Sequence, residues 1–231
     1  MIPLRDDAPR TTIPYVNYFL IVLNTLVFLF EVSLGPRTRA GFVFQFGFTP
    51  THVNAWLSGG FPADSALVPF FSSMFLHASW GHLIGNMWML TIFGDNIEDQ
   101  LGHFRYLIFY LLAGLGADLT HYIFNINSEI PSVGASGAIA GVMGAYFVLF
   151  PSARVLTWVF IFFVRLPAWL ILGYWFIGEF LSGAATAITY SHETSGGGGV
   201  AFWAHVGGFI TGIILIKILP ARRQYYSYEG Y

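Results

Sequence analysis

The chain contains no cysteine, which excludes disulfides, thiolate metal sites and a cysteine nucleophile together. Charge is also scarce, because only 10% of the 231 residues are charged, against roughly 25% in a soluble domain. The net charge of −2 gives no basis for binding nucleic acid. Hydrophobic residues make up 55% of the chain, and the mean hydropathy is +0.64. Such a composition needs lipid as its solvent, so we predict a membrane protein.

Six segments are apolar and about long enough to form membrane-spanning helices, which need roughly 20 mostly apolar residues. We predict an all-α bundle, with the acidic cluster after the second segment ending that helix. The apolar stretch 155–164 is expected to lie along the membrane surface, because Arg165 and Pro167 interrupt it. The predicted spans are about 16–34, 81–94, 104–124, 136–150, 168–185 and 201–219.

The basic residues support this topology. With residues 1–14 and 220–231 as cytoplasmic tails, eight of the ten basic residues fall on the inner side, as the positive-inside rule requires. The two outer ones are Arg37 and Arg39. No signal-peptide cleavage site precedes the first span, so we expect that span to be retained. The inner residues are Arg5, Arg10, Arg105, Arg154, Arg165, Lys217, Arg222 and Arg223.

Two connections on the outer side differ sharply in composition. The 46 residues from Gly35 to Trp80 are rich in phenylalanine, so we expect interfacial helices that lie at the outer headgroup level. Residues 191–199 read Ser-His-Glu-Thr-Ser-Gly-Gly-Gly-Gly, which is typical of a flexible loop. Because no linker or long repeat interrupts the chain, we predict one domain over residues 1–231.

A hydroxyl and an imidazole open two of the apolar segments. Ser136 lies at the start of the fourth and His205 near the start of the sixth, at a similar predicted depth. Polar groups inside a membrane are costly and mark functional sites by default. A serine hydroxyl becomes a useful nucleophile when a base takes its proton. Either residue alone fits a packing role better than a catalytic one, but together they favour nucleophilic catalysis.

Small residues should bring these two helices together. Gly137 and Gly141 form one Gly-xxx-Gly pair, and Gly208 and Gly212 form another. Such pairs let membrane helices pack with their backbones almost in contact. Ser136 directly precedes the first pair and His205 lies three residues before the second. The spacing therefore predicts that the two side chains lie within hydrogen-bonding reach.

The second span adds two polar residues on one helical face, His82 and Asn86. Serine acyl transfer needs hydrogen-bond donors aimed at the developing oxyanion. His82, Asn86 and the backbone N–H of Ser136 could supply them. A structural polar pair that faces a neighbouring helix explains His82 and Asn86 equally well.

These motifs together resemble the rhomboid intramembrane serine proteases. The matching residues, in order, are His82-xxx-Asn86-Met87, Gly134-Ala-Ser136-Gly137 and Ala204-His205-xx-Gly208-xxx-Gly212. Phe93 to Asp99 and Phe150 to Val155 also look like the bacterial members. The resemblance runs from about Ser72 to Leu219.

The resemblance implies a Ser136–His205 dyad without a third acid and an oxyanion site that includes Asn86 and His82. It further implies that the fifth helix and an outer cap loop control the lateral entry of substrates. Many relatives carry an aromatic residue four positions after the serine, where this chain has Ala140; Trp203 or Tyr146 could replace it beside His205. A Trp-Arg pair of some relatives is also absent, since Leu57 follows Trp56.

Four other ionisable residues lie in predicted spans, and for them we favour structural or gating roles over a proton pathway. Glu179 has no evident partner beyond proximity to a water-filled cavity. No metal-binding spacing occurs, and we expect neither a metal nor a cofactor. The four residues are Glu31, Asp118, His121 and Glu179.

The sequence therefore predicts a six-span serine endopeptidase that cleaves transmembrane segments of single-span membrane proteins. The alternative is a non-catalytic membrane transporter, or a protein that binds transmembrane helices. We expect it in a bacterial plasma membrane, with both termini cytoplasmic.

Overall fold

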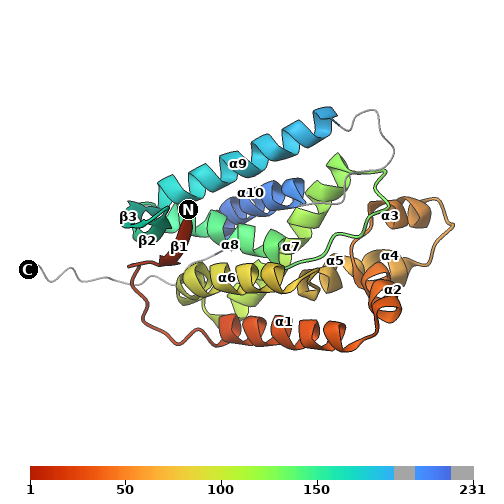
Figure 1. The fold of residues 1–231 in the computed structure, drawn as a ribbon, viewed down its shortest axis with the longest axis horizontal. Coiled ribbons are helices and arrows are strands. Elements are labelled where there is room, and N and C mark those ends of the chain that lie inside the picture. The colour runs from red at the N-terminus through yellow and green to blue at the C-terminus, as the bar shows by residue number, and fades with distance from the viewer. Residues whose placement is uncertain (190–200, 220–231) are drawn as a thin grey trace, which may run out of the picture.

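The computed structural model describes residues 1–189 and 201–219, and this part of the chain is mostly helical (Figure 1). A long helix occupies each of the six predicted segments. α1, α7 and residues 168–186 of α9 are long and apolar enough to cross a membrane, and α8 and α10 are shorter apolar helices. The six long helices are α1 (Tyr15–Ser33), α6 (Trp80–Leu101), α7 (His103–Phe124), α8 (Ser136–Leu149), α9 (Ala168–Thr189) and α10 (Phe202–Ile218).

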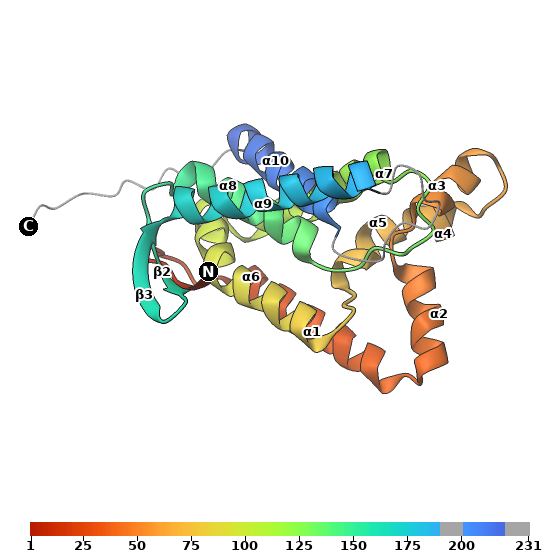
Figure 2. The ribbon, with the colours of Figure 1, turned by 45° about the horizontal axis from the view of Figure 1, so that its top comes forward.

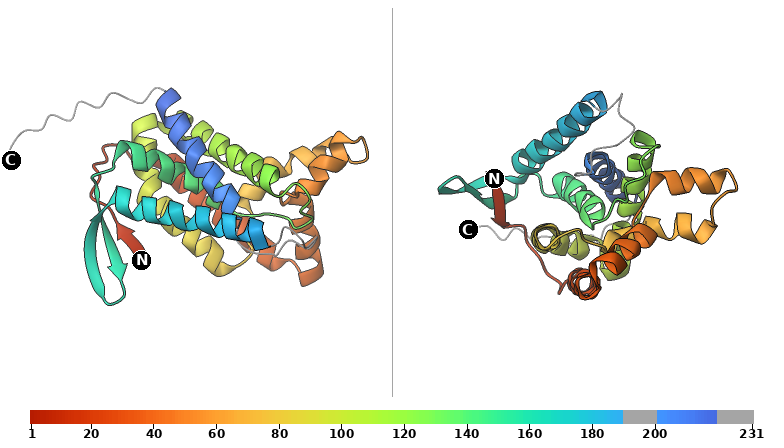
Figure 3. Two further views of the ribbon diagram at one scale, coloured as in Figure 1. Left: turned by 90° about the horizontal axis from the view of Figure 1, so that it is seen from above. Right: turned by 45° about the vertical axis from the view of Figure 1, so that its right-hand side comes forward.

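α8 lies at the centre of the bundle. It packs against α6, α7, α9 and α10, and its residues Gly137 to Tyr146 are all buried. α1 and α9 lie on opposite outer sides, as Figure 1 and the right-hand view of Figure 3 show. This arrangement surrounds the start of α8 with protein on most sides and leaves α9 at the rim.

α8 and α10 pack backbone against backbone. A Cβ atom added to Gly208 would lie 2.0 Å from the Gly137 carbonyl oxygen, and one added to Gly212 would lie 2.0 Å from that of Gly141. No side chain fits at such separations, so glycine is needed at both positions of α10. This close packing fixes the register of the two helices and with it the relative position of their first turns.

The acidic cluster at the end of the second predicted span does not end the helix, contrary to the prediction. α6 continues to Leu101, and Glu98 and Asp99 are buried. Glu98 accepts hydrogen bonds from the backbone N–H groups of Val16 (3.0 Å) and Asn17 (2.7 Å). The first N–H groups of a helix have no partner within it, so the Glu98 carboxylate caps the start of α1 and does not stop α6.

A three-stranded antiparallel sheet departs from the predicted all-α class. It consists of β1 (Ile2–Arg5), β2 (Arg154–Val159) and β3 (Phe162–Pro167), in that order. The N-terminal segment, expected to be a tail, therefore pairs with the stretch expected to lie along the membrane surface. The β2–β3 hairpin carries exposed aromatic side chains, with Phe160 90% exposed at the turn. The pairing of β1 escaped prediction because its partner β2 lies about 150 residues away, and the β2–β3 hairpin occupies the stretch expected to lie along the membrane surface.

The long aromatic connection is helical, as predicted. Its α2 lies at the end of the molecule away from the sheet (Figure 2). Glu31 of α1 is fully buried there, 3.9 Å from Arg39 of α2. The predicted flexible loop 191–199 lies outside the described residues. The elements of the connection are α2 (Pro36–Phe46), α3 (Pro50–Leu57), α4 (Ala63–Leu67), α5 (Pro69–Ser72) and the 3₁₀ helix η1 (Ser73–Phe75).

Replacing Gly208 should destabilise the protein. In Gly208→Ala the new methyl group meets a backbone carbonyl that cannot rotate away, and we expect a loss of about 1–3 kcal/mol in the free energy of unfolding. Unfolding by sodium dodecyl sulfate in mixed micelles measures this loss. Gly178→Ala on α9 is the matched control, since an added Cβ there has nothing within 4 Å. Equal stability of the two variants would contradict the packing argument.

Removing the Glu98 carboxylate should also destabilise the protein, through α1. Glu98→Ala leaves the N–H groups of Val16 and Asn17 without their acceptor, at a cost of about 1–3 kcal/mol. The same unfolding titration measures the effect, with exposed Glu129→Ala as the control. A Glu98→Ala protein as stable as this control would show that the cap is dispensable.

Candidate active site

Ser136 and His205 meet across the seam between α8 and α10. Ser136 is the first residue of α8, and His205 lies in the first turn of α10. The Nε2 atom of His205 is 2.7 Å from the Ser136 Oγ atom, which is hydrogen-bonding distance. The contact has the geometry of a serine paired with its general base.

The other ring nitrogen of His205 also has a partner, which comes from α9. Its Nδ1 atom is 2.8 Å from the Oε2 atom of Glu179. Both side chains are largely enclosed, at 11% and 16% exposed. Ser136, His205 and Glu179 thus form a continuous chain of hydrogen bonds across three helices. Beside the Ser136–His205 pair that the resemblance implies, the structure thus places a carboxylate against the second ring nitrogen.

An aromatic ring beside His205 is likewise supplied by α9. The ring of Trp175 lies 5.8 Å from the imidazole, centroid to centroid. Neither predicted substitute for the missing aromatic residue at Ala140 occupies this place. Trp203 stacks on Phe124, and Tyr146 of α8 packs against Phe93 of α6.

Trp175 and Glu179 are therefore the contacts that sequence reasoning missed. Their spacing of four residues on one predicted helix places them on the same face, and that was the available signal. The sequence does not show how α9 is rotated about its own axis. It therefore could not show that the helix face with Trp175 and Glu179 is turned toward His205.

His82 lies beside the serine on the α6 side. A Cβ atom added to Gly134 would lie 2.7 Å from the His82 Nε2 atom and 3.6 Å from the Ser136 Oγ atom. Gly134 also has a φ angle of +132°, which L side chains rarely adopt. Glycine therefore lets the chain pass between the imidazole of His82 and the start of α8.

Asn86 faces a second buried histidine. Its Nδ2 atom is 3.0 Å from the Nε2 atom of His77, whose ring lies 5.2 Å from that of His82. Because an amide nitrogen only donates, His77 accepts and its ring is neutral. The polar residues His77, His82 and Asn86 thus form one group next to the Ser136 turn.

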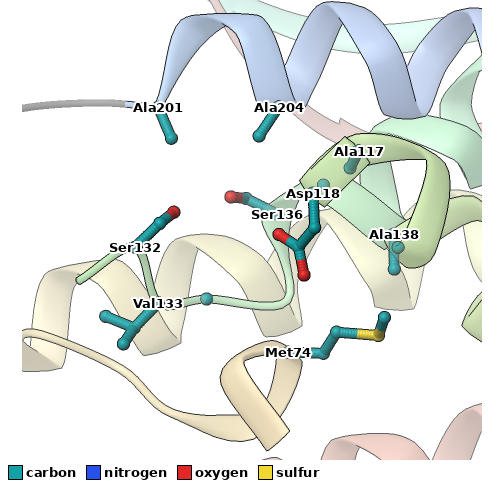
Figure 4. A pocket seen from close by; sticks show the side chains of 12 residues that line it. Met74, Ala117, Asp118, Ser132, Val133, Ser136, Ala138, Ala201 and Ala204 are labelled. Carbon is teal, nitrogen blue, oxygen red and sulfur yellow. The ribbon is translucent and has the colours of Figure 1, made fainter. Parts of the chain in front are cut away.

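A small recess of about 20 Å³ lies in front of Ser136 (Figure 4). It is lined by the 132–138 turn, the start of α10 and part of α7. The carboxylate of Asp118 is among its polar groups and accepts a hydrogen bond from the Ser73 hydroxyl at 3.2 Å. The first backbone N–H groups of α8, which have no partner within the helix, also belong to this turn. The Ser136 hydroxyl thus borders this space, and His205 contacts the same hydroxyl from α10.

The remaining ionisable residues have structural contacts. His121 on α7 is buried next to Asn125, and Glu31 accepts a hydrogen bond from the His77 backbone N–H at 3.0 Å. Glu31 is therefore enclosed by protein. Among residues 1–189 and 201–219, no group of three His, Asp or Glu side chains could hold a metal ion.

A family model decides the relationship. The model described as Rhomboid domain matches residues 64–222, more than half of the chain. The chain belongs to the rhomboid family. It is thus an integral membrane protein, as the composition predicts, and the predicted resemblance is confirmed.

Named rhomboid relatives come from several kinds of membrane. Rhomboid-like protein 11, chloroplastic, of Arabidopsis thaliana is 32% identical over 65% of this chain and 51% of its own length. Rhomboid protein 1, mitochondrial, of Saccharomyces cerevisiae is 28% identical over 68% and 44%, respectively. Rhomboid protease GluP of Bacillus subtilis is 32% identical over 57% and 24%. The match thus spans about half of the plant and yeast rhomboids or less.

The neutral state of His77 has a consequence for stability. Burial, and secondarily the nearby His82, lowers the pKa of His77 from 6.5 to about 3. The folded protein therefore binds fewer protons than the unfolded chain between these values. The contribution of His77 to the free energy of unfolding is complete above pH 6.5. It falls as the pH drops toward 3, by at most about 1.4 kcal/mol per pH unit.

This pH dependence can be isolated by substitution. His77→Gln keeps an acceptor for Asn86 but cannot titrate, so its unfolding free energy should fall less steeply than that of the wild type between pH 6.5 and 4. Unfolding titrations at a series of pH values provide the measurement. Parallel curves for the two proteins would mean that His77 does not titrate on unfolding.

Proposed function

We propose that this rhomboid is an intramembrane serine endopeptidase with Ser136 as nucleophile and His205 as general base. The observation that carries the proposal is the 2.7 Å contact between the His205 Nε2 and Ser136 Oγ atoms. Family membership supports it, and one relative is named a rhomboid protease.

The proposed reaction follows the scheme of serine hydrolases. The Ser136 Oγ atom attacks the peptide carbonyl while its proton passes to His205 Nε2. The resulting tetrahedral intermediate collapses, the C–N bond breaks, and the leaving amine takes that proton. Water, deprotonated by His205, then attacks the acyl ester, the ester C–O bond breaks, and the Ser136 oxygen takes that proton back from His205 as the carboxylic acid leaves. No cofactor or metal takes part in these steps.

Three groups are suited to stabilise the oxyanion. They are the backbone N–H of Ser136, the His82 ring and the Asn86 amide. The start of a helix favours negative charge, which adds to the effect of these donors. His82 is the best supported of the side chains, because its ring lies against the same turn as Ser136.

The proposed substrates are transmembrane segments of single-span proteins. In this proposal the six long helices all cross the bilayer, both termini are cytoplasmic, and residues 1–231 form one domain. Hydrolysis needs water, so the recess at Ser136 would open to the outer side. The rim position of α9 supports lateral entry of the substrate beside it. A bacterial plasma membrane is proposed as the location, although organellar relatives carry the same domain.

Replacing the serine tests this function. Ser136→Ala should reduce cleavage of a co-expressed single-span protein by at least about 10³-fold, because no nucleophile remains. It should also abolish labelling by a fluorophosphonate, which in the wild type adds its mass to the peptide containing Ser136. Mass spectrometry reads both outcomes.

Ser152→Ala is the matched control, since Ser152 is exposed in the turn after α8. It should cleave and label like the wild type. Unchanged cleavage by Ser136→Ala would overturn the protease proposal. Binding of the single-span protein without any cleavage by the wild type would favour a non-catalytic helix-binding protein.

A further inference from the structure

Glu179 is an ionisable residue on a helix that otherwise presents apolar side chains to the bundle. Its carboxylate is only 16% exposed and lies 2.8 Å from His205 Nδ1. Placing a carboxylate in such a site is costly unless a partner compensates, and His205 is the partner that the structure provides. The free-energy cost of burying this carboxylate points to a role for Glu179 other than packing.

We propose that Glu179 is a positioning residue for His205, so that the site works as a Ser136–His205–Glu179 triad assembled from α8, α10 and α9. The proposal rests on the hydrolytic function given above. It adds an acid where motif resemblance implied a dyad. The acid comes from the rim helix, far in sequence from the motif residues.

The first argument concerns the tautomer of His205. An ionised carboxylate only accepts hydrogen bonds, so its contact requires the proton on Nδ1. The lone pair then lies on Nε2, which faces the Ser136 Oγ atom at 2.7 Å. This is the tautomer that can remove the serine proton. Glu179 therefore selects the reactive form of the base.

The second argument concerns charge. When the serine proton reaches Nε2, the imidazole becomes a cation inside a partly enclosed site. A carboxylate in contact with Nδ1 stabilises that cation without taking the proton, which stays on Nδ1. Among the described residues, the other ionisable groups around the site are His82 on α6 and Asp118 and His121 on α7. Glu179 is the carboxylate that is hydrogen-bonded to His205.

The third argument is that α9 provides two supports at once. Trp175 lies one turn before Glu179 and places its ring 5.8 Å from the imidazole. At Ala140, the position where many relatives have an aromatic residue on the serine helix, this chain has only a methyl group. The orientation of His205 therefore depends on α9 to an unusual degree, and Glu179 supplies the directional part of that support.

Glu179→Gln separates this role from packing. The amide preserves volume and can still accept from Nδ1, but it carries no charge and can also donate, which would favour the wrong tautomer. We expect kcat/KM for a single-span substrate, and the rate of fluorophosphonate labelling of Ser136, to fall about 10- to 1,000-fold.

The pH profile is the decisive readout. Without the carboxylate the imidazolium loses the partner that stabilises it, so the acidic limb of kcat/KM should move to lower pH. Glu179→Asp should recover part of the rate and return the limb toward its wild-type position. A purely structural role would alter the amount of folded protein and leave the limb in place.

Controls keep this result separate from the proposed function. Glu129→Gln, at an exposed position between α7 and α8, should retain the wild-type rate and profile. Rates are normalised to folded protein by the unfolding titration, so a destabilised Glu179→Gln can still be compared. If the wild type is labelled and Glu179→Gln keeps the wild-type rate and pH profile, the triad is overturned but the hydrolase function is not. A wild type that neither cleaves nor labels overturns the hydrolase itself.

Discussion

The contact between the backbones of α8 and α10 is the constraint on which the rest of the site depends. The two Gly-xxx-Gly pairs allow carbonyl oxygens of α8 to lie against glycines of α10, so the helices can neither slide nor rotate without a clash. Ser136 and His205 occupy the first turns of these helices. Their hydrogen-bonding distance is therefore set by main-chain packing, which is less compliant than packing through long side chains.

The outer helix α9 makes a different kind of contribution. It packs against α8 and α10 through larger side chains and begins directly after β3. Through Trp175 and Glu179 it touches the face of His205 that the serine does not use. The nucleophile and base are thus held by a rigid pair of helices, while the outward side of the base belongs to a helix at the rim. Lateral substrate entry beside α9 and support of His205 would then involve one element.

Much of this arrangement could be read from the sequence, since the helices follow from apolar length and the α8–α10 approach follows from glycine spacing. The predicted pairing of Ser136 with His205 needed only those two features. Contacts that depend on helix rotation or on distant strands could not be read in this way. Glu179 had no motif to mark it, and β1 pairs with β2 across about 150 residues. The acidic residues around Glu98 resemble a helix end in the sequence. Their partners, the backbone N–H groups at the start of α1, cannot be recognised there, because any residue has such a group.

That capping of α1 also bears on how the protein is made. Glu98 follows Asn17 by 81 residues, so α1 leaves the ribosome well before its carboxylate partner exists. Until α6 has been synthesised, these N–H groups can find hydrogen-bond partners only in water. The contact between Glu98 and the start of α1 therefore closes only after both helices exist, and it joins two helix ends that are far apart in the sequence.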